Sequence, residues 1–118
     1  MEFLKPKPRK FDTGTLIVTD DVVNMMEDEN FRSFVYASYI RYCANDWGDI
    51  ERCDQKLNRQ NLKHKGNLGG RYVDKDNEWE IWILTTGSRD RTIISLPSYG
   101  LSESDIEGRR KEAENEVM

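Results

Sequence analysis

Hydrophobic residues in this chain are concentrated in a few segments, and residues 78–99 form the densest of them. From Trp79 to Thr85 large apolar side chains occupy both sets of alternating positions. This pattern predicts a strand that is buried on both faces, or covered by a helix on one. After a polar break, residues 91–96 repeat the β-branched pattern until Pro97, which has no backbone N–H to donate. The two segments predict a β-hairpin.

Elsewhere in the chain, apolar residues at alternating spacing (period 2) or helical spacing (period 3.6) predict further strands and helices. β-Branched residues early in the chain favour a strand, and apolar residues at helical spacing favour three helices. The predicted strands are about 14–19, 70–73, 78–85 and 91–96, and the predicted helices are about 20–27, 30–44 and 54–65. Short turns between the last three strands predict a meander. The expected fold class is α+β, with a small antiparallel sheet of three to four strands and the helices packed on it.

The length of 118 residues is about that of one domain. Residues 1–12 are rich in Lys and Arg and contain two prolines, so we expect a flexible basic arm. Residues 13–100 are expected to form a single α+β domain. Residues 101–118 are mostly charged and predict a tail or a solvated helix.

Composition narrows the function classes. The formal net charge of −4 argues against a general nucleic-acid coat, although a local basic patch is still compatible with it. Cys43 and Cys53 lack the spacing of a zinc knuckle or a redox motif. No apolar run reaches the roughly 18 residues that span a bilayer, and the first residues lack the apolar segment of a secretory signal. We therefore expect a cytosolic protein that does not enter a membrane.

Acidic residues around the 45–54 turn are one candidate for chemistry. Asp46, Asp49 and Asp54 offer the oxygen ligands that Mg²⁺ prefers, which would suit hydrolysis of phosphodiesters. The alternative is structural: Asp46 and Asp49 shape the turn, Asp54 caps the following helix, and Asn58 hydrogen-bonds buried backbone in the Trp47 turn. The structural alternative is the more common arrangement. We therefore assign no metal ligand, catalytic residue or cofactor.

Basic residues form two more candidate sites. Arg89 and Arg91 flank a turn, where they would clasp a phosphate or carboxylate or simply remain solvated. Lys56, Arg59 and Lys63 share one face of the predicted 54–65 helix, as in a phosphate-tracking stripe or a solvated helix face.

The aromatic residues fit either the hydrophobic core or a surface that binds a partner. The predicted 30–44 helix has a second apolar stripe that includes Tyr36 and Tyr39. This stripe either packs in the core or presents a tyrosine-rich face to a partner. Trp47 lies in a tight turn with Gly48, and we expect its indole to be part of the core.

Several segments together carry a resemblance. They are the 14–19 strand, Asp46-Trp47-Gly48-Asp49, Ile81-Trp82-Ile83, Asp90-Arg91-Thr92 and Leu96-Pro97. This pattern resembles a family of small uncharacterised proteins encoded on bacterial plasmids, integrative elements and phages. The resemblance covers roughly residues 13 to 99 and implies a genomic context rather than a chemistry.

The leading hypothesis is a non-catalytic accessory protein of a mobile element that binds another macromolecule. Its expected partner is a protein such as a host defence nuclease of the restriction or CRISPR type, or the complex of that nuclease with nucleic acid, because basic channels attract acidic proteins. The alternatives are a metal-dependent enzyme acting on phosphodiesters and a nucleic-acid-binding module. The residues assigned to a binding surface are Tyr36, Tyr39, Asp46, Asp49, Lys56, Arg59, Lys63, Arg89 and Arg91.

Overall fold

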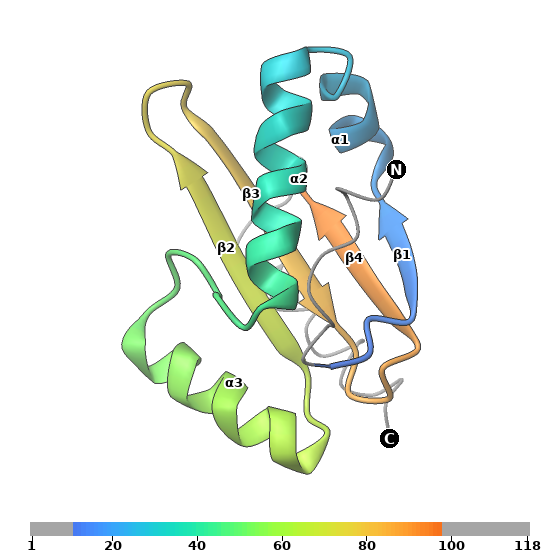
Figure 1. Ribbon diagram of the computed structural model, residues 1–118, viewed down its shortest axis with the longest axis vertical. Coiled ribbons are helices and arrows are strands. Elements are labelled where there is room, and N and C mark those ends of the chain that lie inside the picture. The colour runs from blue at the N-terminus through green and yellow to red at the C-terminus, as the bar shows by residue number, and fades with distance from the viewer. Residues whose placement is uncertain (1–10, 98–118) are drawn as a thin grey trace.

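The computed structural model describes residues 11–97 of the chain. These residues form a four-stranded sheet of order β1-β4-β3-β2, with α1 and α2 on one face and α3 beside β2 (Figure 1). The α+β fold class predicted from the sequence is confirmed. In chain order the elements are β1 (Thr15–Val18), α1 (Asp20–Met25), α2 (Glu29–Cys43), α3 (Arg52–His64), β2 (Leu68–Asp74), β3 (Trp79–Thr85) and β4 (Arg91–Ser95).

The ends of the chain are only partly described. Residues 1–10 of the predicted arm, and the whole predicted tail or helix over 101–118, lie outside the described residues. Phe11, which we had placed in the arm, belongs to the folded domain. Its ring meets that of Tyr42 at 84° with centroids 5.4 Å apart, and it lies 5.8 Å from the ring of Trp47.

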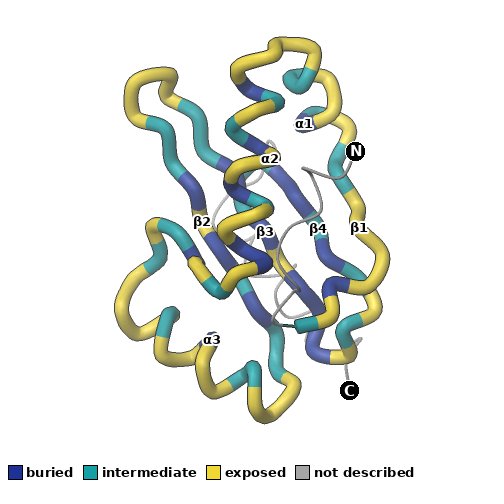
Figure 2. Tube along the Cα trace, in the orientation of Figure 1, coloured by how far each residue is buried: buried dark blue, intermediate teal, exposed yellow. Residues whose placement is uncertain are grey.

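The core lies between α2 and one face of the sheet (Figure 2). In β3 the side chains of Ile81, Ile83 and Thr85 are buried, whereas Leu84 on the other face is 38% exposed. The buried residues of α2 recur at helical spacing, which makes one continuous stripe. They are Phe31, Val35, Ser38, Tyr42 and Cys43. Of the two arrangements predicted for β3, the structure has the one in which helices cover a single face.

The predicted direction of the first strand is wrong. β1 pairs with β4 in parallel, from Thr15 opposite Arg91 to Val18 opposite Ile94. A parallel pair needs a long crossover, and all the other helices and strands lie between these two strands in the chain. The β2-β3-β4 meander is antiparallel as predicted. The sheet is therefore mixed.

Element boundaries differ from the predicted ones for local reasons. β2 begins at Leu68, two residues before the predicted start, and so includes Gly69 as well as Gly70. At Gly70 a Cβ atom would meet the ring of Tyr42 at 3.0 Å, so the close approach of α2 favours glycine there. β3 begins after Glu78, whose φ of 57° belongs to the preceding turn. α1 ends at Met25 because Asp28 already caps α2. Within residues 11–97 there is no helix long and apolar enough to span a bilayer.

Candidate functional site

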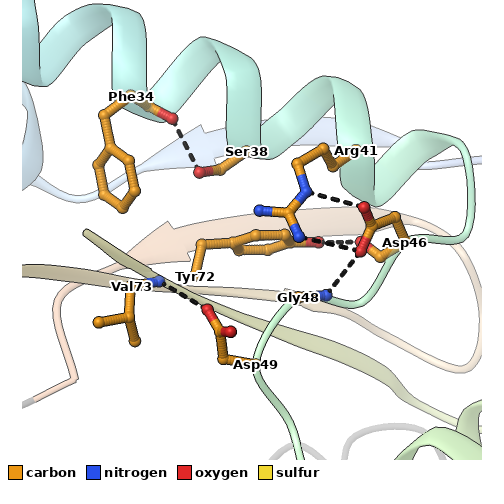
Figure 3. A network of polar contacts seen from close by, with 8 residues as sticks. All are labelled: Phe34, Ser38, Arg41, Asp46, Gly48, Asp49, Tyr72 and Val73. Atoms are coloured by element: carbon orange, nitrogen blue, oxygen red, sulfur yellow. Dashed lines mark hydrogen bonds and ion pairs between the residues drawn. The ribbon is translucent and has the colours of Figure 1, made fainter. Parts of the chain in front are cut away.

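The Asp46–Asp49 turn lies along the outer edge of β2. The N–H of Arg71 donates to the carbonyl of Trp47 (3.1 Å), and the N–H of Asp49 donates to the carbonyl of Arg71 (2.6 Å). Further along, the N–H of Val73 donates to the carboxylate of Asp49 (3.1 Å; Figure 3). The turn thus takes the place of a neighbouring strand. Its polar groups satisfy backbone groups that an edge strand would otherwise expose.

Asn58 of α3 continues this protection of the edge. Its side-chain amide donates to the carbonyl of Gly69 (2.7 Å) and accepts the N–H of the same residue (3.2 Å). Asn58 is 5% exposed. A primary amide carries a donor and an acceptor side by side, so it can pair with a peptide group as another strand would. We expected Asn58 to bond buried backbone in the Trp47 turn, but it bonds β2 instead.

Asp46 is held by an arginine and by the turn itself (Figure 3). Arg41 donates to both carboxylate oxygens, at 2.8 Å and 3.2 Å, and the N–H of Gly48 adds a third bond at 3.1 Å. The hydrogen bond from Arg41 lowers the pKa of the Asp46 carboxyl. Tyr72, whose phenol pKa is raised by burial, donates its O–H to the carbonyl of Asp46 at 2.7 Å. Asp46 therefore ties the end of α2 to β2.

This pairing predicts a defined pH dependence for Asp46→Asn. Because the folded-state pKa of Asp46 is lowered, the pair stabilises fully above the unfolded value of about 3.9 and stops doing so as the pH falls through the folded value. The urea midpoint of the wild type should exceed that of Asp46→Asn at about pH 7, and the two should converge as the pH falls below the lowered pKa of the folded state. In the background of Arg41→Gln the same comparison should show much less dependence on pH. An equal dependence in that background would contradict the assignment.

A second polar group, which the sequence patterns did not reveal, lies on the face of the sheet away from the core helices. Arg71 contacts Glu80 at 2.9 Å, and the indole N–H of Trp82 donates to the other oxygen of Glu80 at 2.9 Å. The hydrogen bond from Arg71 lowers the pKa of the Glu80 carboxyl. The signal that could have found this group is the meander register, which makes Arg71 and Glu80 diagonal neighbours.

Arg89 has a structural role. Its guanidinium donates to the carbonyls of Gly66 (2.7 Å), Thr86 (2.9 Å) and Asn61 (2.9 Å). Burial lowers the pKa of this guanidinium, and the cation lies against the carboxyl end of α3, where a positive charge is favourable. Arg91 is half-buried and also has interactions within the protein. The structure thus uses Arg89 to join the last turn of α3 to the β3-β4 turn.

The three aspartates considered as a magnesium site do not converge. Asp46 and Asp49 make the bonds described above. Asp54 lies in the first turn of α3, where Glu51, not Asp54, is the N-cap. Among residues 11–97 the one group of three metal-type side chains within 4.8 Å of one another is Glu51, Cys53 and Asp54. All three are exposed, so we derive no metal chemistry from them.

Other predicted binding residues lie on helix surfaces. Tyr36 is 49% exposed on the outer face of α2. Tyr39 is half-buried, packs against the core and donates its O–H to Thr13 at 3.4 Å. The basic residues predicted on α3 are exposed, namely Lys56, Arg59 and Lys63.

The outer faces of α2 and α3 are thus separate surfaces, and the polar residues of the turn between these helices hold the sheet edge. Each surface has its own chemistry: aromatic and aliphatic on α2, basic on α3. No protein-family model, curated protein or solved structure matches this chain.

Proposed function

We propose that this protein acts without catalysis by binding a protein partner through the outer face of α2. The observation that carries the proposal is the exposure of Tyr36 and Ile40, which are 49% and 43% exposed and lie one turn apart. Ala37 between them is also exposed. The residues of α2 that pack in the core lie on the opposite side of the helix. A tyrosine beside an aliphatic residue is typical of the central residues of protein interfaces.

The charge of the chain supports a basic partner. Residues 52–65 hold five basic residues and one acidic residue, and the whole chain has 18 basic and 22 acidic residues. The remainder therefore has 13 basic and 21 acidic residues, a formal charge of −8. Glu27, Asp28 and Glu29 are exposed where α2 begins, next to its outer face. An apolar surface with an acidic border complements an apolar hollow with a basic rim.

The proposed partner is a host-defence nuclease of the restriction or CRISPR type, whose nucleic-acid channel is basic. The resemblance to proteins of plasmids, integrative elements and phages supports this choice, since such elements encounter these nucleases. The proposed site of action is the cytoplasm of the host. In this role the protein occupies part of the nuclease surface and lowers its activity on the incoming DNA.

A plasmid-challenge assay tests the function. In host cells with an active defence system, expression of the protein should raise the transformation efficiency of a targeted plasmid. The variant Tyr36→Ala/Ile40→Ala should lose the effect, because truncating two central interface residues weakens binding by about tenfold or more. Leu57→Ala is the matched control, since Leu57 is 50% exposed on α3. The proposal fails if restriction and CRISPR hosts show no protection, or if both variants behave alike.

A further inference from the structure

Four basic residues form a straight line along α3. Arg52, Lys56, Arg59 and Lys63 are spaced four, three and four residues apart, so at 3.6 residues per turn they share one side of the helix. The line is about 16 Å long at a rise of about 1.5 Å per residue. All four residues are exposed. We refer to them as the cation stripe.

The anchoring of α3 leaves this stripe on the outside. Asn58 is the buried residue of the helix, and it faces β2. Two more side-chain amides of the helix bond nearby backbone: Gln55 donates to the carbonyl of Ile50, and Asn61 to that of Asn67. The guanidinium of Arg89 donates to the carbonyl of Asn61. On a helical projection the stripe lies about 130° from Asn58. Figures 1 and 2 show the helix beside the sheet, with much of its length exposed.

Among residues 11–97 the side chains of the stripe have no acidic partner, and the same holds for Lys65 and Lys75. No ion pair or hydrogen bond within residues 11–97 involves the side chains of the stripe. Each of the other arginines in this range has interactions within the protein. They are Arg32 with Glu29, Arg41 with Asp46, Arg71 with Glu80, Arg89 with three carbonyls, and Arg91.

We infer that the cation stripe binds the phosphate backbone of a nucleic-acid duplex. A straight row of cations complements the regular row of phosphates along a duplex strand, and each contact releases condensed counterions. Single strands are bound by proteins that add aromatic side chains for base stacking, and the sequence of α3 contains none. The formal charge of −8 on the remainder repels phosphate, which confines the contact to the stripe. Binding is therefore independent of base sequence.

This surface is separate from the α2 face, and the two inferences can fail independently. Binding of duplex needs neither Tyr36 nor Ile40. The variant Tyr36→Ala/Ile40→Ala should bind duplex as the wild type does.

Fluorescence anisotropy tests the inference with the full chain and a labelled DNA duplex of about 20 base pairs, between about 25 mM and about 200 mM salt. The logarithm of the association constant is plotted against the logarithm of the salt concentration. If all four cations contact phosphates, this plot should have a slope of about −3.6. Lys56→Gln/Arg59→Gln should reduce the slope to about −1.8 and weaken binding at low salt by about tenfold or more. Glutamine is a good helix former, so the helix should persist.

The matched control is Arg32→Gln/Lys75→Gln, which removes the same charge. These residues lie in the first turn of α2 and in the β2-β3 turn, at the opposite end of the molecule from α3 (Figure 1). The control should keep the wild-type slope. Lys56→Arg/Arg59→Lys should also keep it, and all variants should share the thermal midpoint of the wild type to within about 2 °C.

Four results would overturn the inference. They are the absence of duplex binding at about 25 mM salt, a loss of affinity in the control variant equal to that in Lys56→Gln/Arg59→Gln, and tighter binding to a single strand of the same length than to the duplex. The fourth is that polyglutamate competes for the protein as well as unlabelled duplex of matched charge does. The last result would identify an acidic protein as the occupant of the stripe.

Discussion

Replacement of Trp47 by alanine is expected to lower the free energy of unfolding by about 3 to 5 kcal/mol. The side chain is 6% exposed, and its ring meets that of Tyr42 at 78° with centroids 5.4 Å apart. Phe11 packs beside it. Removal of the indole leaves a cavity beside the rings of Tyr42 and Phe11, and the loss is a large part of the roughly 5 to 15 kcal/mol that stabilises a domain. Urea unfolding followed by circular dichroism measures it.

Trp82→Ala is the control for this prediction. Trp82 is half-buried on the face of the sheet away from the helices, where its indole N–H bonds Glu80. Its removal exposes less new surface, so a cost of about 1 to 2 kcal/mol is expected. A midpoint of Trp47→Ala within error of the wild type would show that the indole is not part of the core.

Gly48→Ala should cost about 3 kcal/mol or more, although it adds one methyl group. Gly48 has a φ of 74°, and a Cβ atom there would lie 2.1 Å from the carbonyl oxygen of Arg71 and 2.8 Å from the ring of Tyr72. The backbone contact cannot relax without separating the turn from β2. Equilibrium unfolding in urea gives the size of the effect.

Gly69→Ala provides the comparison for that variant. Its φ is not positive, and its new Cβ would meet the flexible end of Leu84 at 3.0 Å. A cost below about 1 kcal/mol is expected, because the Leu84 side chain can move. Equal costs for the two variants would contradict the close approach of the turn to β2.

Hydrophobic periodicity predicted most of the fold because each strand and helix has a local signal. The β2-β3-β4 meander followed from short turns. The parallel pairing of β1 did not follow, since Thr15–Val18 shows the same β-branched pattern whichever way its partner runs. The direction is set by the connection through the helices, and that connection depends on tertiary packing.

The site was predictable where its chemistry is local. Turn formation by Asp46 and Asp49 followed from their positions around Gly48. The bonds of Arg89 did not, because its partners include backbone carbonyls 23 and 28 residues away. The pairing of Asn58 with Gly69 was likewise hidden, since every residue has a peptide group and no sequence pattern marks the one that an amide will reach.

The way in which α3 is attached also bears on how this protein can change over generations. The amide contacts of Asn58 and Asn61 and the hydrogen bond from Arg89 fix the position of the helix, and they do not involve the outward positions. Substitutions at those positions leave the core untouched, so selection for a new ligand need not oppose selection for folding. A chain built in this way can exchange one recognition surface for another while β2 and the Trp47 turn remain the same.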